Sequence, residues 1–214
     1  MASVAEGTAK VASLNDALRH LVRIAGAIAG ANEPELRAVM SGALIHVDPS
    51  AVEEIILQSY LFAGFPRALN AARTWRAVSG RRAPEGDVEA SPAEVRAWRE
   101  RGEETCEIVY GDSYRRLRAN IRALHPTLDE WMIVDGYGKV LSRAGVDLRT
   151  RELCVVAACA VAGQQRQLHS HLRGALNTGS SAEEIAAVLD VLSDLVPPED
   201  LTRYRQLLQK VKNQ

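Results

Sequence analysis

Apolar residues recur at helical spacing along almost the whole chain, and no stretch keeps the apolar-polar alternation of a half-buried strand. The pattern therefore predicts an all-α fold. The clearest predicted helix covers residues 165–177, where one stripe at helical spacing consists of Leu168, His171, Leu172, Ala175 and Leu176. Because this stripe is expected to be buried, the imidazole of His171 should lie within an otherwise apolar face.

An internal repeat appears when the chain is aligned with itself at an offset of 132 residues. The matches pair Arg19, Leu21, Ala25, Leu36, Gly42, Ala43 and Leu44 with Arg151, Leu153, Ala157, Leu168, Gly174, Ala175 and Leu176. After a two-residue slip, Glu53-Glu54-Ile55 meets Glu183-Glu184-Ile185. We expect two copies of a helical hairpin, each followed by a third helix. The copies should pack on each other or on neighbouring subunits, because one hairpin alone exposes its apolar face.

Turn signals divide the chain into four segments. We expect an N-terminal degenerate repeat at 1–78, a linker at 79–91, connecting helices at 92–148 and a C-terminal repeat at 149–214. In the connecting segment, residues 94–110 and 129–141 are predicted helices, with a helix start at Pro92. Ser-x-x-Glu signals predict capping boxes at Ser50, Ser91 and Ser181.

Composition and charge exclude several classes of protein. With 214 residues, 47% of them hydrophobic, the chain can bury a substantial core. Its net charge of -1 and its scattered arginines do not indicate nucleic-acid binding. The longest wholly apolar stretch, at 153–163, is about half of what a bilayer-spanning helix needs, so no membrane span is expected. Residues 1–10 lack the features of a secretory signal, which favours a cytoplasmic location.

The second copy carries a family resemblance. The run Arg143-Ala-Gly-Val-Asp-Leu-Arg-Thr-Arg-Glu-Leu153, an alanine-rich helix, and then His171-Leu-Arg-Gly-Ala-Leu-Asn-Thr-Gly179 and Glu183-Glu184-Ile185 resemble the signature of the carboxymuconolactone decarboxylase and alkylhydroperoxidase D superfamily. In the first copy, residues 42–44, 53–55 and 60–68 resemble the later helices of the same family. The resemblance implies the AhpD-like multihelical fold, chemistry without a metal or organic cofactor, and a homo-oligomer, with a trimer expected.

The peroxidase branch of that superfamily carries a Glu, then a Cys-x-x-Cys pair, then a His four residues beyond the second cysteine. Counting from Glu152 places Gln164 and Gln167 at the cysteine positions and His171 at the histidine position. A glutamine side chain forms neither a thiolate nor a sulfenic acid, so a thiol peroxidase is the disfavoured alternative. The cysteines at 106, 154 and 159 have no metal-type spacing and are expected to be small buried hydrophobes.

His171 and Glu152 form the candidate catalytic pair. At the 132-residue offset, the positions of His171 and Glu152 hold Val39 and His20, so the pair is absent from the first copy and one site per chain is expected. By resemblance, His171 would be the acid or base and Glu152 would orient it. The alternatives remain open: His171 as a core histidine bonded to a carbonyl or to Glu152, and Glu152 as a helix-dipole partner after an N-cap at Asp147.

The resemblance also implies a substrate, a small lactone or carbonyl acid that loses carbon dioxide. Its carboxylate would be bound by Arg173, Arg151 or Arg143, although each arginine is otherwise a surface or interface ion-pair residue and Arg173 points away from His171 on an ideal helix. Gln164 and Gln167 would donate hydrogen bonds to an oxyanion or merely fill the vacated cysteine positions, and Tyr60 would line the pocket or pack in the core. The competing hypothesis is a binding or assembly protein that keeps the scaffold without catalysis.

Overall fold

The computed structural model describes residues 14–213, and this part of the chain contains helices and no strand. The α-helices are α1 (Asp16–Gly30), α2 (Glu33–Ala43), α3 (Pro49–Ala63), α4 (Phe65–Ser79), α5 (Val95–Tyr110), α6 (Tyr114–Leu124), α7 (Pro126–Trp131), α8 (Leu148–Val161), α9 (Gln165–Asn177), α10 (Ala182–Val191) and α11 (Pro198–Lys212). The short 3₁₀ turns are η1 (Val88–Ala90), η2 (Pro92–Glu94) and η3 (Gly111–Ser113), and η4 (Met132–Leu141) is a π-helix. The all-α prediction is confirmed. The interpretation of residues 1–10 lies outside the described part.

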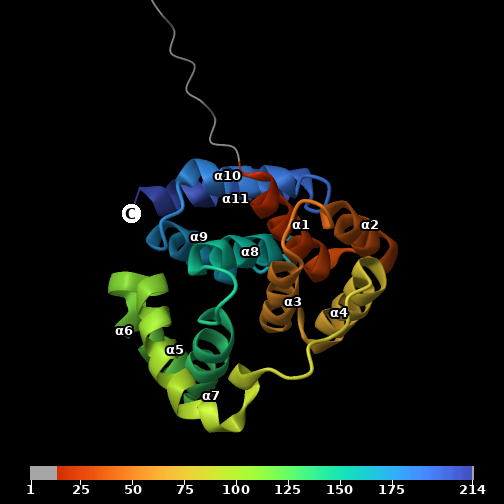
Figure 1. The fold of residues 1–214 in the computed structure, drawn as a ribbon. Coiled ribbons are helices and arrows are strands. Elements are labelled where there is room, and N and C mark those ends of the chain that lie inside the picture. Colours follow the sequence, from red (N-terminus) through yellow and green to blue (C-terminus); the bar gives the residue numbers. More distant parts are fainter. Residues whose placement is uncertain (1–13, 214) are drawn as a thin grey trace, which may run out of the picture.

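Helix α8 lies at the centre of the molecule (Figure 1). Ten consecutive residues, 151–160, are buried, because the alanine-rich sequence is apolar on nearly every side. Helix α1 packs against it, and Gly26 and Gly30 permit the close approach: a Cβ at Gly26 would lie 2.7 Å from Leu192 Cδ2, and one at Gly30 would clash with Val161. Helices α10 and α11 cover one side of this pair and α3 lies on the other (Figure 1).

The helix bounds can be compared with the predicted repeat. A shift of 132 residues brings the first residues of α1 and α2, Asp16 and Glu33, onto Leu148 and Gln165, where α8 and α9 begin. The third helices, α3 and α10, also follow in the same order. The bounds thus agree with the offset, whereas a shared three-dimensional repeat and the four-segment division stay predictions.

Helix caps show where the sequence signals hold. Ser181 and Glu184 form the predicted capping box at the start of α10. The box predicted at Ser50 is wrong, because the helix begins one residue earlier, at Pro49, and Asp48 is its N-cap. Proline at the first helical position favours this start, since its fixed φ already matches the helix.

The start of the connecting segment also differs from the prediction. The Ser91 hydroxyl accepts from the backbone N–H of Ala93 at 3.3 Å instead of forming a capping box, and residues 92–94 form the 3₁₀ turn η2. The α-helical part begins at Val95 and ends at Tyr110, which confirms the helix predicted at 94–110. The helix predicted at 129–141 begins earlier, at Pro126, and becomes the π-helix η4.

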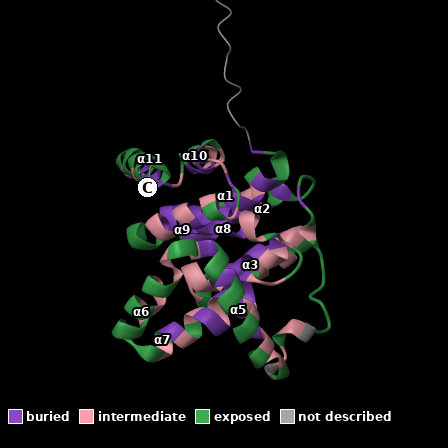
Figure 2. Cartoon of the chain, turned by 90° about the vertical axis from the view of Figure 1, so that its left-hand side faces the viewer, coloured by how far each residue is buried: buried purple, intermediate pink, exposed green. Residues whose placement is uncertain are grey.

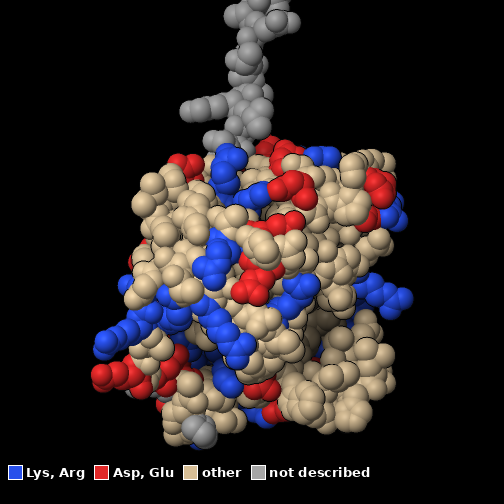
Figure 3. Space-filling model, turned by 90° about the vertical axis from the view of Figure 1, so that its right-hand side faces the viewer, with Lys and Arg blue, Asp and Glu red and all other residues tan. Residues whose placement is uncertain are grey.

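Buried residues lie at the centre of the molecule, and most charged residues lie on its surface. Buried residues gather along α1, α3 and α8, while α6 and much of α11 are exposed (Figure 2). On the face seen in Figure 3, basic and acidic side chains lie side by side. Within residues 14–213, no helix is both long and apolar enough to cross a bilayer.

Candidate active site

The structure brings His171 and Glu152 together across the hairpin of α8 and α9. The Nδ1 atom of His171 lies 2.8 Å from Oε2 of Glu152. Glu152 has no exposed surface and His171 is 5% exposed. Both positions follow from the helices: Asp147 caps α8 by accepting from the N–H of Thr150, and the stripe of α9 turns His171 inward. The spatial proximity expected from the sequence is therefore observed.

The imidazole of His171 is also held by an aromatic ring. Phe62, on α3, meets it edge to face, with ring centroids 5.5 Å apart and an angle of 88° between the planes. Glu152 contacts Nδ1, so Nε2 is the ring nitrogen that this carboxylate does not contact. A carboxylate at this position favours the tautomer in which Nδ1 carries the proton and donates to it.

The carboxylate of Glu152 fits against a glycine. A Cβ at Gly174 would lie 2.5 Å from Oε2 of Glu152 and 2.7 Å from Cγ1 of Val109, so a larger residue displaces the carboxylate or the helix. The other oxygen, Oε1, is buried and has no hydrogen-bond partner in the described structure. Burying a carboxylate oxygen without a hydrogen-bond donor destabilises the folded state. Buried polar atoms of this kind are rare, and they indicate a functional role or an ordered water.

Two tyrosines lie near the same carboxylate. The rings of Tyr110 and Tyr137 meet at 75° with centroids 6.0 Å apart. Burial raises the pKa of both phenols, and the charge of Glu152 acts in the same direction, so both hydroxyls stay protonated. The sequence analysis missed these residues, because they lie on the connecting helices and only the packing of α5 and η4 brings them to Glu152.

The three cysteines are buried and unpaired. Burial raises the pKa of Cys106 and Cys154 well above the ordinary value and raises that of Cys159 to about 12, with the charge of Glu152 as a second cause for Cys159. Thiols of this kind are not ionised near neutral pH. The geometry therefore supports the prediction that these cysteines are buried hydrophobes.

Arg143 and Arg151, which were expected to bind substrate, both contact Glu54. Arg151 is fully buried, and its Nη2 donates to Oε2 of Glu54 at 2.8 Å and to the carbonyls of Arg143 and Ala144 at 3.1 Å. Arg143 donates to the same carboxylate at 2.9 and 3.0 Å. Both guanidinium groups bind Glu54 and hold α3 to the segment before α8, as in the ion-pair alternative for these arginines. A role of Arg143 or Arg151 in binding a substrate carboxylate stays a prediction.

The remaining predicted site residues lie at or near the surface. Gln164 and Gln167 are exposed, so they do not fill an interior space. Tyr60 is partly buried and packs on Phe65, with ring centroids 5.3 Å apart. Arg173 lines a surface hollow between α6 and α9. Neither His171 nor Glu152 lines this hollow or the two others described for this part of the chain.

Comparison with known proteins identifies the segment that carries the pair. The model described as "Carboxymuconolactone decarboxylase family" matches residues 130–196, which contain both His171 and Glu152. "Peroxisomal protein 2" of Schizosaccharomyces pombe is 26% identical over 174 residues, which cover 79% of this chain and 81% of that protein. The resemblance inferred from the sequence is confirmed over residues 130–196.

Proposed function

From the carboxymuconolactone decarboxylase family match at residues 130–196, we propose that His171 and Glu152 form a proton-transfer pair acting on a small lactone or carbonyl acid. The reaction is decarboxylation or a related proton transfer. The observation that carries the proposal is the 2.8 Å contact between His171 Nδ1 and Glu152 Oε2 in a buried setting.

In a decarboxylation, the bond between the substrate carbon and its carboxylate breaks, and carbon dioxide leaves. The electron pair of that bond passes into the lactone or carbonyl group as an enolate, and the carbon then takes one proton. Protonated His171 would deliver it from Nε2 and become neutral, and solvent would restore the proton. The anionic Glu152 stabilises the imidazolium before transfer and holds the ring in one orientation throughout.

A packing role alone explains the pair less well. At the 132-residue offset the position of His171 holds Val39, and that of Glu152 holds His20. Val39 is partly buried on the stripe of α2, so a hydrocarbon can occupy the equivalent stripe position. A buried carboxylate bonded to a buried imidazole costs desolvation energy that a hydrophobic pair does not. A role in proton transfer would explain why the fold retains this buried pair despite its desolvation cost.

The test compares His171→Gln with the wild-type protein. The glutamine amide can still donate to Glu152, which preserves the buried hydrogen bond, but it cannot transfer a proton at neutral pH. We expect release of carbon dioxide from carboxymuconolactone to fall by about 10² to 10⁴-fold, with little change in melting temperature. His46→Ala is the matched control, because His46 lies on the exposed side of the first copy and should leave turnover unchanged.

A non-catalytic scaffold is the second candidate function. The favouring observation is that Glu152 is completely buried and that the pair lines none of the three hollows described above. In this case the wild-type protein would turn over no lactone or carbonyl acid, and His171→Gln would change only the stability. That combination of results would reject the proton-transfer proposal.

Self-association and location extend the proposal. Large apolar side chains remain exposed, among them Phe65, Leu124 and Trp131, and a homotrimer would cover part of this surface. Light scattering on the purified protein should then give three times the chain mass of 23.3 kDa, and a monomeric mass would contradict it. We propose a cytoplasmic location, and tagging in cells would distinguish it from the peroxisome that the relative's name indicates.

A further inference from the structure

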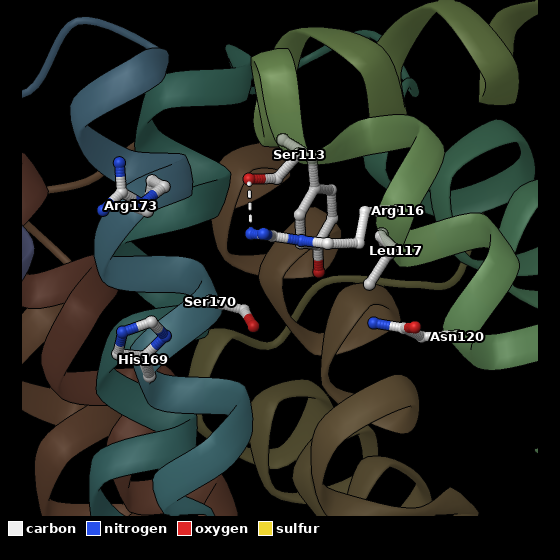
Figure 4. Close-up of a pocket in the computed structure, with 8 residues that line it drawn as sticks. Ser113, Arg116, Leu117, Asn120, His169, Ser170 and Arg173 are labelled. Atoms are coloured by element: carbon white, nitrogen blue, oxygen red, sulfur yellow. Dashed lines mark hydrogen bonds between the residues drawn. The ribbon is translucent and has the colours of Figure 1, made fainter. Parts of the chain in front are cut away.

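The surface hollow between α6 and α9, which Arg173 lines, is polar. Its volume is about 390 Å³, and it is lined by Tyr110, Ser113, Arg116, Leu117, Asn120, His169, Ser170 and Arg173. The side chains of α9 form one side, and those of α6 and η3 form the other (Figure 4). This volume lies within the range of sites for small molecules. No aspartate or glutamate is among the residues that line the hollow.

The two helices that flank the hollow carry positive charge without acidic residues. The sequence of α6, YRRLRANIRAL, contains four arginines and no carboxylate, and that of α9, QRQLHSHLRGALN, contains two arginines, two histidines and no carboxylate. On α6, Arg118 and Arg122 are bound by Asp129 of α7. Arg116 is the arginine of α6 that lines the hollow.

Basic side chains from both helices line this hollow. The guanidinium group of Arg116 extends toward α9, where Arg173 and His169 line the opposite side (Figure 4). In addition, its Nη2 lies 3.5 Å from the Ser113 hydroxyl. A negatively charged group bound in the hollow is attracted by the basic side chains that line it.

We propose that this hollow binds a small organic anion bearing a carboxylate or phosphate group, at a site separate from His171 and Glu152. Guanidinium groups bind both kinds of anion through paired N–H donors. The hydroxyl of Ser113 and the amide of Asn120 add neutral donors, while Tyr110 and Leu117 give the carbon part of the ligand an apolar wall. The polar head and the apolar part of the ligand thus each have a surface to contact.

The separation from the proton-transfer pair follows from helical geometry. His169, Ser170 and Arg173 line the hollow, whereas His171 belongs to the buried stripe that faces α8. A variant at His171 should therefore leave anion binding intact. Failure of the proton-transfer proposal and failure of this one can be told apart by measuring binding and turnover on the same variants.

Isothermal titration calorimetry with phenyl phosphate and with benzoate tests the proposal, with benzyl alcohol as the neutral control. We expect one or both anions to bind with an affinity that falls as salt is added, and benzyl alcohol not to bind. The phosphate and carboxylate arms show which anion the hollow prefers. Arg116→Ala and Arg173→Ala should each weaken binding by about tenfold or more, the effect of losing one charged hydrogen bond.

Arg115→Ala is the matched control. Arg115 is the exposed neighbour of Arg116 on the same helix and is not among the residues lining the hollow. Its replacement by alanine removes the same positive charge as Arg116→Ala. We expect it to change the affinity by less than about twofold. Absence of binding by both anions overturns the proposal, and so does a loss for Arg115→Ala as large as that for Arg116→Ala. Because Arg116 is exposed, its replacement does not disturb the core.

Discussion

At the scale of single residues, a glycine determines how Glu152 reaches His171. Gly174 lies near the C-terminal end of α9, where a Cβ would touch both the Glu152 carboxylate and Val109. The 132-residue offset places Gly42 at the matching position of α2, where a Cβ would meet nothing within 4 Å. The same residue type is thus required by packing in one copy and not in the other.

Gly174→Ala should disrupt the candidate site. The added methyl group overlaps the carboxylate of Glu152, so we expect a loss of about 1–3 kcal/mol in the free energy of unfolding, together with reduced turnover. Gly42→Ala is the control: without a clash, alanine in a helix should be neutral or stabilise by up to about 1 kcal/mol. Urea denaturation of both variants measures the difference, and equal effects would contradict the packing argument.

The buried thiols give a second prediction at this scale. Because burial raises the pKa of Cys106, Cys154 and Cys159, the folded protein should react with dithionitrobenzoate about 100-fold more slowly than the unfolded protein, in which all three thiols react. Rapid labelling of the native protein would reveal an accessible thiol. Replacing all three cysteines with alanine should leave any peroxide consumption unchanged.

The contact between His171 and Glu152 could be predicted from the sequence, whereas the partners of the arginines could not. His171 and Glu152 were predictable because a charged or polar residue interrupts an apolar pattern and the first copy supplies a comparison. The partners of Arg151 were not predicted, because they are the carboxylate of Glu54, 97 positions away, and backbone carbonyls. Contacts of this kind arise from the tertiary fold and leave no mark in local spacing.

At the scale of elements, α5 and η4 meet at glycines. A Cβ at Gly102 would clash with the carbonyl of Ile133, and one at Gly138 would clash with the carbonyl of Trp98. The two helices therefore approach until their backbones touch. This contact positions Tyr110 and Tyr137 beside Glu152, so the crossing of two connecting helices shapes the wall of the candidate site.

Gly138→Ala should separate these helices. Because the clash is with backbone, which cannot rotate away, we expect a loss of about 3 kcal/mol or more in unfolding free energy. Gly136→Ala, two residues earlier in the same π-helix, has its nearest new contact at 4.0 Å and should change stability by less than about 1 kcal/mol. Thermal melts of the two variants test this, and a stable Gly138→Ala protein would refute the close crossing.

The pattern predicted α9 at its observed bounds, because its apolar stripe is strong. Helix α6 was not predicted, although Tyr114, Leu117, Ile121 and Leu124 recur in it at helical spacing. None of its residues is fully buried. The π-helical hydrogen bonding of η4 was not predictable either. Its apolar residues fit an α-helix equally well, and the choice between the two depends on packing against α5.

At the scale of the whole molecule, Glu54 joins three distant parts of the chain. Its carboxylate on α3 accepts from Arg143 and Arg151, and Arg143 also binds Asp87 at 2.8 Å. Burial alone would raise the pKa of Glu54, but the hydrogen bonds from Arg143 and Arg151 outweigh it and hold the pKa below its ordinary value. The charged form is therefore the one that stabilises the fold.

Glu54→Gln should weaken the fold in a pH-dependent way. A carboxyl group with a lowered pKa stabilises the folded state above its unfolded pKa, and this contribution is lost as pH falls through the folded value. We expect wild type to exceed the variant by about 3–5 kcal/mol at pH 7 and by progressively less below about pH 4.3. Glu100→Gln, in an exposed pair with Arg96, should cost less than about 1 kcal/mol. A pH-independent difference for Glu54→Gln would contradict the ion pairing.

The packing of α1 on α8 also has a consequence for protein synthesis. The apolar side of α1 can be buried against α8 only after α8, which begins 132 positions later, has left the ribosome. At about 5–20 residues per second, this interval is roughly 7–26 seconds. During that time the nascent N-terminal half exposes hydrophobic surface. We therefore expect chaperones that act on nascent chains to bind it.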